Sequence, residues 1–199
     1  MGWYATNADG YSNNGLKVGG SWGFVADIFI MEGYAFTTGF NVLFINGSMT
    51  YPDAMVTEQS SKLIPGTIQR DFKTRYVQLP LIFTMKTKPI KEKVRIFGQV
   101  GFGLGFLLSA KSMDTFTPDE GSESVIDEHN AKDDFRFTRE SLILGAGAEI
   151  PVHGSMFIRT GIKFDNAFTN VLTGYNQLDS EIKNNGRNNI IEIFAAIIF

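Results

Sequence analysis

The chain has 199 residues without a linker-like stretch, and its 18 basic and 21 acidic side chains leave a net charge of −3. One domain over residues 1–199 is therefore expected, and the lack of a basic surface argues against nucleic acid as a partner. The absence of cysteine excludes disulfides and thiolate metal sites. Because no apolar run reaches the roughly 18 residues of a membrane helix, any membrane role must use strands.

Seven stretches alternate between apolar residues and small or polar ones, which is the period of a β-strand. They cover residues 16–30, 34–44, 75–87, 95–109, 136–150, 156–165 and 188–199. The last ends on Phe199 with no polar tail and has about the 9–11 residues of a tilted membrane strand. Gly2–Ala5 is predicted to be the end of a shortened first strand, which brings the number of strands to about eight. Pro80 lacks an N–H, so a bulge or kink is expected there.

The connections between these stretches alternate between short and long. Short links lie at 31–33, 88–93 and 152–154, whereas long polar excursions lie at 47–74, 111–134 and 170–187. Outer-membrane barrels place short turns on the periplasmic side and long loops outside. The sequence therefore predicts an all-β, antiparallel up-and-down transmembrane barrel in the bacterial outer membrane. No signal peptide follows Met1, so we expect the export signal to lie outside this sequence.

One face of the predicted strands carries bulky apolar side chains and the other carries glycine and charge. An eight-stranded barrel has room only for tightly packed side chains, so the bulky face should point to lipid. In a soluble lipocalin-like carrier, the alternative, the faces would be reversed. The residues predicted to face lipid are Trp22, Phe24, Phe36, Phe40, Phe44, Phe83, Phe102, Phe106, Leu142, Leu144, Phe164, Ile193, Ile197 and Phe199. Aromatic girdles are predicted from Trp3, Tyr4, Tyr51 and Tyr76 at the loop end and from Tyr34 and Phe199 at the turn end.

The inward face is predicted to hold a polar network. Its members are Lys17, Asp27, Asn41, Gln78, Lys86, Arg95, Gln99, Arg139, Glu149, Arg159, Lys163, Asp165 and Glu192. Buried charges of both signs must pair, so a plugged interior is favoured over a conducting pore. If the hairpin turns at Gly154, Glu149 pairs with Arg159 across the ladder, and Lys163 lies near Glu192.

No arrangement of residues predicts catalysis. The two histidines, His129 in an acidic loop and His153 in a short turn, fall at opposite ends of the predicted barrel. The acidic residues around His129 are read as a solvated loop rather than a metal site, and no cofactor is expected. The Gly101–Gly105 run lies inside a strand and is no nucleotide fingerprint. A lipid-modifying barrel with a site at the lipid-facing rim is the enzyme alternative.

Three motifs carry a family resemblance. They are Tyr76-Val77-Gln78-Leu79-Pro80-Leu81, the glycine-rich run from Gly98 to Phe106, and Leu144-Gly145-Ala146-Gly147-Ala148-Glu149. The chain from about Gly15 to Phe199 resembles the PorT-like outer-membrane β-barrel family of Bacteroidota. The resemblance implies an eight-stranded porin-family barrel exported through the periplasm, with one branch tied to type IX secretion and gliding. It implies no catalytic residues.

The sequence thus predicts a non-enzymatic integral outer-membrane barrel with a plugged polar interior. Outer-membrane lipid is its expected surrounding, and the long loops are its expected contact with other membrane or secretion proteins. An accessory barrel of a protein-secretion machine and a narrow solute pore are the alternatives within the membrane.

Overall fold

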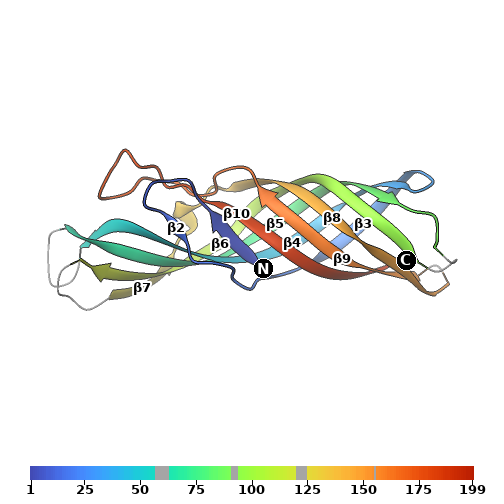
Figure 1. Cartoon of the computed structure of the whole chain (residues 1–199), viewed down its shortest axis with the longest axis horizontal. Coiled ribbons are helices and arrows are strands. Elements are labelled where there is room, and N and C mark those ends of the chain that lie inside the picture. The colour runs from blue at the N-terminus through green and yellow to red at the C-terminus, as the bar shows by residue number, and fades with distance from the viewer. Residues whose placement is uncertain (57–62, 91–93, 120–124, 155) are drawn as a thin grey trace.

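The computed structural model describes residues 1–56, 63–90, 94–119, 125–154 and 156–199, which form a nearly closed all-β barrel (Figure 1). Its elements are β1 (Gly2–Ala5), β2 (Ser12–Asn13), β3 (Gly20–Met31), β4 (Tyr34–Val56), β5 (Leu63–Lys86), β6 (Arg95–Pro118), β7 (Val125–Asn130), a 3-10 turn (Lys132–Asp134), β8 (Thr138–His153), β9 (Met156–Ala167) and β10 (Arg187–Ile198). The described residues contain no helix long and apolar enough to cross a membrane.

Eight strands follow one another around the wall in the order β1, β10, β9, β8, β6, β5, β4 and β3, and every pairing is antiparallel. This confirms the predicted up-and-down barrel. The short first strand is also present, since Gly2–Ala5 pairs with residues 187–190 of β10. The chain starts about midway along the wall and ends at the end of the barrel that carries the short turns (Figure 1). We call that end the turn end and the opposite one the outer end.

Two of the three predicted loops are mostly strand, so that part of the prediction is wrong. β4 and β5 stay paired from Phe44–Arg75 out to Val56–Leu63, and β5 and β6 stay paired out to Gly66–Pro118. β8 leaves β6 at Phe106, and beyond that point β7 pairs with β6 instead. We call the resulting projection, formed by β2, β7 and residues 45–56, 63–74 and 107–118, the outer sheet. Residues 57–62 and 120–124 of the predicted loops, and 91–93 of the predicted short link, lie outside the described residues.

The outer sheet projects far beyond the rest of the barrel at the outer end (Figure 1). Twelve residues of β4, 45–56, lie in it, and at roughly 3.3 Å per residue they span about 40 Å. On the inward side these strands mix apolar residues with polar or small ones, as in β5, where Ile68 and Phe72 alternate with Arg70 and Thr74. Such a mixture interrupts the apolar repeat that marks a strand in a sequence.

Pro80 affects the sheet differently from the expected bulge. The β4–β5 ladder pairs Thr38 with Leu81 and next pairs Asn41 with Gln78, so pairing lapses beside Pro80 while the register is kept. A register shift lies instead in the β5–β6 ladder, where Arg75 and Tyr76 pair with Ser109 and Leu107 and leave Leu108 of β6 as the extra residue. The missing N–H of proline therefore removes ladder bonds without inserting a residue.

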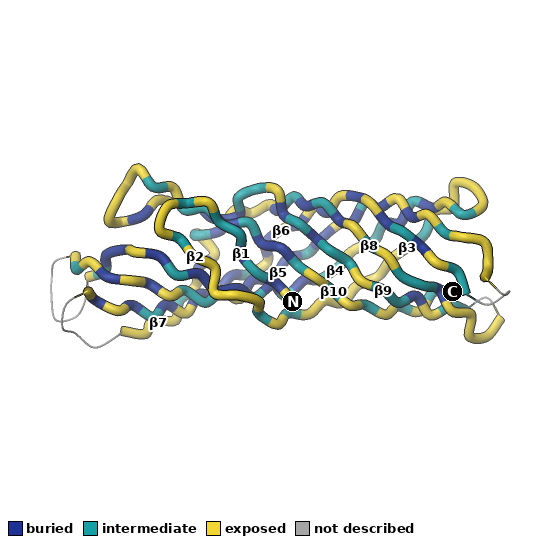
Figure 2. The backbone as a smooth tube through the Cα atoms, viewed as in Figure 1, coloured by how far each residue is buried: buried dark blue, intermediate teal, exposed yellow. Residues whose placement is uncertain are grey.

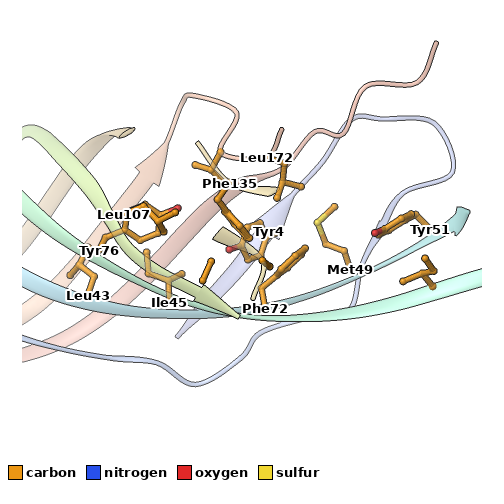
Figure 3. Close-up of a cluster of buried hydrophobic side chains, with 14 of the residues drawn as sticks. Tyr4, Leu43, Ile45, Met49, Tyr51, Phe72, Tyr76, Leu107, Phe135 and Leu172 are labelled. Carbon is orange, nitrogen blue, oxygen red and sulfur yellow. The ribbon is translucent and has the colours of Figure 1, made fainter. Parts of the chain in front are cut away.

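An apolar core fills the outer half of the barrel interior (Figure 3). Tyr4 and Tyr76 have 0% of their surface exposed and Tyr51 has 6%, so their assignment to an aromatic girdle is wrong. Each lies on the inward side of its strand. Trp3 is only half-buried and stacks on Phe164 with ring centroids 6.1 Å apart. Buried and exposed residues alternate along most strands (Figure 2), as expected for a wall with two different faces.

The structure places the residues predicted to face lipid on the outer side of the wall. Phe102 is 56% exposed, Leu144 is 42% exposed and Ile193 is 81% exposed. Phe36, Phe44, Leu142 and Phe164 are half-buried by their neighbours on the same side. A band of this kind in water would far exceed the apolar patch that a soluble monomer tolerates.

The close approach of strands at Gly101 generates a stability prediction. A Cβ at Gly101 would lie 2.2 Å from the Leu81 carbonyl oxygen and 2.6 Å from the Ile82 Cα, so the backbone would have to move. Gly101→Val should lower the free energy of unfolding by about 1–3 kcal/mol in detergent, measured by urea titration of tryptophan fluorescence. Val100→Leu, at the adjacent exposed position, is the control and should have an effect below about 0.5 kcal/mol. Equal midpoints for the two variants would contradict the tight packing at Gly101.

Candidate functional site in the barrel interior

Four charged side chains form one cluster inside the turn half of the barrel. The Lys86 Nζ lies 2.8 Å from Asp27 Oδ2 and 2.9 Å from Glu149 Oε1. The Arg159 guanidinium donates to Glu149 Oε1 from Nε at 2.8 Å and from Nη2 at 2.6 Å, and it also donates to Asp27. No more than 7% of any of these side chains is exposed. Two acids and two bases therefore form a closed, neutral ring, which we call the charged quartet.

Neutral polar groups complete the quartet. The Thr37 hydroxyl donates to Asp27 Oδ1 at 2.7 Å and lies 2.8 Å from the Thr84 hydroxyl, to which Gln99 Nε2 donates at 3.1 Å. The Arg159 guanidinium carbon also lies 5.7 Å from the centre of the Phe97 ring. Such bonds offset the cost of removing four charges from water, which pairing alone seldom does.

A second polar centre lies closer to the outer end. Arg139, which is fully buried, donates from Nη2 to Asp165 Oδ1 at 2.7 Å and to the Asn188 carbonyl at 3.1 Å. Gln78 donates from Nε2 to Asp165 Oδ2 at 2.7 Å. The centre fits because the facing strand carries glycine: a Cβ at Gly103 would lie 2.4 Å from Gln78 Nε2. In the narrow interior, glycine on one strand therefore leaves the room that the polar side chains of another strand need.

Both ion pairs predicted from the strand register form. Glu149 is opposite Arg159 in the β8–β9 ladder, and Glu192 is opposite Lys163 in the β9–β10 ladder with Lys163 Nζ 3.4 Å from Glu192 Oε2. The roles of Asp27 and Lys86 were less visible, because their strands are separated in sequence from β8 and β9. The register of neighbouring strands can be estimated from the position of the hairpin turn. Contacts between strands on opposite sides of a barrel cannot be estimated in this way.

Three predicted members of the network belong neither to these two centres nor to the Lys163–Glu192 pair. Lys17 pairs with Asp71 at 3.2 Å, and its side chain is 40% exposed. The Arg95 guanidinium carbon lies 5.4 Å from the centre of the Phe157 ring near the turn end. Asn41 lines a cavity beside β3. The predicted set is thus divided among several environments.

Sequence reasoning missed a further polar contact under the outer sheet. The Arg70 Nε donates to Asp114 at 2.8 Å, and its Nη1 lies 3.3 Å from Asp134. The Arg70 guanidinium carbon also lies 5.9 Å from the centre of the Tyr51 ring. Burial raises the pKa of the Tyr51 hydroxyl well above its ordinary value, so this ring stays neutral. Because these residues belong to segments predicted as loops, no sequence pattern indicates that they pair.

The excursion at 170–187 packs onto the inner face of the outer sheet. Asn176 Nδ2 donates to the Pro52 carbonyl at 2.7 Å, and the Gln177 N–H donates to Asp53 Oδ1 at 2.8 Å. The Tyr11 ring stacks on Tyr51 with centroids 4.5 Å apart. Together with Val171 and Leu172 of the apolar core, these contacts cover the interior at the outer end.

The histidines occupy opposite ends, as predicted. His129 lies on β7 in the outer sheet, with Nδ1 3.2 Å from Asp127 Oδ2, and His153 ends β8 at the turn end. Over the described ranges, no three His, Cys, Asp or Glu residues are grouped so that they could hold a metal ion. The charged side chains of the interior instead bond to one another.

The charged quartet generates a second stability prediction. Arg159→Ala should lower the free energy of unfolding by about 3 kcal/mol, because Asp27 and Glu149 would then share Lys86 alone. Urea titration in detergent measures this loss. Replacing Glu149 and Arg159 together by alanine leaves a neutral Asp27–Lys86 pair and should recover part of it. A single Arg159→Ala variant as stable as the wild-type protein would show that the quartet contributes nothing.

Comparison with known proteins identifies the family. The family described as "Outer membrane protein beta-barrel domain" matches residues 3–173, which run from the second residue of β1 to beyond β9 and leave out β10. No curated protein and no solved structure matches the chain. The match agrees with the antiparallel barrel and its outward apolar band. The chain therefore belongs to the outer membrane β-barrel protein family.

Proposed function

We propose that this protein is a non-enzymatic outer-membrane barrel with a plugged interior, and that its outer sheet binds other proteins outside the membrane. The plugged interior is supported by one observation: two different kinds of side chain fill the inside of the barrel. The turn half holds the charged quartet, and the outer half holds the apolar core. A solute crossing the barrel would have to pass both.

The two fillings resist opening for different reasons. Separating the quartet would leave buried charges without partners, at a cost of several kcal/mol. Parting the apolar core would expose Phe72, Phe135 and Leu172, whose rings and methyl groups now pack under the outer sheet. A narrow solute pore is therefore the weaker alternative.

The non-enzymatic part of the proposal rests on how the reactive groups are distributed. His129 and His153 lie at opposite ends, and the interior carboxylates bond to arginine and lysine. A catalytic base needs a nucleophile within hydrogen-bond reach. Asp27 and Glu192 do bond to the hydroxyls of Thr37 and Ser21, but each of these carboxylates also pairs with a lysine or arginine. The lipid-modifying barrel is the weaker alternative, because His129 on β7 and His153 at the end of β8 both lie outside these groups.

The outer sheet is the surface best suited to a protein partner. β7 forms its edge, and Ile126 is 69% exposed there while Asp127 and Glu128 have side chains that are 57% and 64% exposed. An edge strand offers backbone groups for pairing, with side chains of alternating direction to select the partner. Met113, on the neighbouring strand, extends the apolar part of this surface.

A second candidate places the barrel in a protein-secretion machine. The resemblance of the Tyr76–Leu81 motif and the glycine runs to PorT-like barrels supports an accessory subunit of a type IX or gliding system. The projecting outer sheet favours it, because a plugged barrel with a large external surface suits a scaffold better than a channel. In this case the partner would itself be a membrane or secreted protein of that machine.

Conductance tests the plug. The purified protein in planar bilayers should give no discrete current steps, because both halves of the interior are filled. A wider outer-membrane porin in the same bilayer is the positive control. Regular steps from the wild-type protein would overturn the plug and favour the solute pore.

Photo-crosslinking in cells tests the outer sheet. A photoreactive residue at Ile126 should give a protein adduct, whereas one at Leu178, which is 47% exposed outside the outer sheet, should not. Mass spectrometry of the Ile126 adduct separates a secretion-machine component from other partners. Equal adducts from both positions, or none from Ile126, would count against the outer sheet as the binding surface.

A further inference from the structure

The apolar band on the outside of the wall ends abruptly on β4, β5 and β6. Its last members toward the outer end are Phe44, Val77 and Leu108. Beside and beyond them the outward side chains are polar or basic: Asn46 on β4, Arg75 and Lys73 on β5, and Ser109 and Lys111 on β6. In an outer-membrane barrel this limit is where the hydrocarbon of the outer leaflet gives way to the lipid headgroups.

Three cations lie side by side at this limit. Lys73 is directly opposite Lys111 in the β5–β6 ladder, and Arg75 is opposite Ser109, two residues along from each lysine. Residues opposite each other have Cβ atoms roughly 4.5–5.5 Å apart, and residues two apart on one strand are separated by about 6.7 Å. Such long side chains can bring their charged groups to the same small anion. We call Lys73, Arg75 and Lys111 the basic trio.

The protein itself does little to neutralise the basic trio. Among the described residues, its two members on β5 form no ion pair, and Lys111 only approaches Glu128 at 3.9 Å, with the two side chains 70% and 64% exposed. The next outward residue of β5, Asp71, pairs with Lys17 at 3.2 Å. Like charges directly opposite each other in a ladder are destabilising. An anion that bridges the trio would therefore stabilise this part of the wall.

Bulky apolar side chains lie on the turn-end side of the basic trio. The Arg75 guanidinium carbon is 5.4 Å from the centre of the Phe44 ring, a contact that holds the cation against the wall. On β6, Phe106 lies against Phe137 with ring centroids 5.8 Å apart, and Phe137 is 63% exposed. With Leu108 these rings form an apolar surface next to the three cations. The order of the two surfaces matches a lipid, whose phosphate lies outside its acyl chains.

The same limit has a different composition on β8, β9 and β10. On β8 the first polar outward residue after Leu142 is Glu140, and on β9 and β10 the corresponding residues are Asn166 and Asn189. A carboxylate repels an anionic headgroup, and an amide carries no charge to attract one. Phosphate is therefore favoured beside β5 and β6 over these three strands.

We propose that the basic trio binds the phosphate of a phosphorylated lipid in the outer leaflet, whose acyl chains lie along Phe106 and Phe137. Hydrogen bonds from lysine and arginine to phosphate oxygens are charge-assisted, and a guanidinium can hold two oxygens at once. The phosphate also removes the repulsion between Lys73 and Lys111. This lipid site goes beyond the plug and the protein-binding outer sheet and depends on neither.

Binding of lipid A, the phosphorylated glycolipid of the outer leaflet, tests the proposal. A fluorescent lipid A is titrated into the protein in uncharged detergent. Lys73→Gln combined with Lys111→Gln should weaken binding at least about tenfold, because two charge-assisted contacts are lost. Lys88→Gln combined with Lys183→Gln is the control, since it removes two exposed charges outside the trio, and it should bind like the wild type. An equal loss in both double variants, or none in the first, would overturn the proposal.

Dephosphorylated lipid A with the same acyl chains separates the phosphate from the apolar contacts. It should bind the wild-type protein at least about tenfold more weakly than lipid A does. Inorganic phosphate at the concentration of the labelled lipid should fail to displace it, because free phosphate has no acyl chains. Equal binding of the two lipids, or displacement by inorganic phosphate, would show that the trio does not select a phosphorylated lipid.

The unfolding temperature of Lys73→Gln provides a second readout, whose sign depends on the lipid. In uncharged detergent alone the variant should unfold at the wild-type temperature or above it, because the repulsion from Lys111 is relieved. With lipid A added it should unfold below the wild type, because a ligand stabilises the folded state according to its affinity. An equal decrease with and without lipid A would give Lys73 a purely structural role and contradict the site.

Photo-crosslinking in cells identifies the occupant directly. A photoreactive residue at Ser109, which lies opposite Arg75, should capture lipid. A protein adduct in place of a lipid adduct would assign the basic trio to an acidic protein partner and overturn the proposal. Since these readouts involve neither conductance nor Ile126, they stand or fall apart from the proposed function.

Discussion

The constraint on which this structure depends is that a bilayer supplies no hydrogen bonds to the backbone. Each strand in the wall must find its partners in other strands, so the sheet curls until its edges meet. Seven long strands of the chain satisfy one another in this way. Closure of the wall then depends on the eighth strand, β1, which pairs over four residues.

The narrowness of an eight-stranded barrel explains the unusual interior. Glycine on the inward face allows strands to approach and leaves room for a few long polar side chains, as at Gly103 beside Gln78. Charges in that space cannot be solvated, so they occur in balanced groups such as Asp27 and Glu149 with Lys86 and Arg159. The outer half of the interior is filled by apolar side chains instead. The loops and the outer sheet supply them, and their burial there removes them from water. One wall therefore encloses two kinds of core.

The sequence predicted those features that depend on local period and on neighbouring strands. Alternation located the wall strands, the division between bulky and small faces gave their orientation, and one hairpin gave the Glu149–Arg159 pair. The outer sheet is hard to detect because the inward side of its strands mixes apolar residues with polar ones, as with Arg70 between Ile68 and Phe72, so that the strands resemble loops in the sequence. Residue type alone predicts a lipid interface for Tyr4 and Tyr76, whereas the side of the strand on which they lie directs them inward. Contacts across the barrel, such as Asp27 with Arg159, depend on closure and have no local signal.

Tyr4 links the apolar core to β1, the strand that closes the wall at the outer half. This ring lies 5.2 Å from the Phe72 ring in the apolar core, and it has room there because Gly47 lacks a side chain: a Cβ would lie 2.1 Å from Tyr4 Cδ2. Four backbone-paired residues alone would hold a strand weakly, so the buried ring is what fixes the face and register of β1. The apolar core thus anchors the strand that joins β10 to the segment before β3, through the pairing of Gly2 with both Ile190 and Lys17.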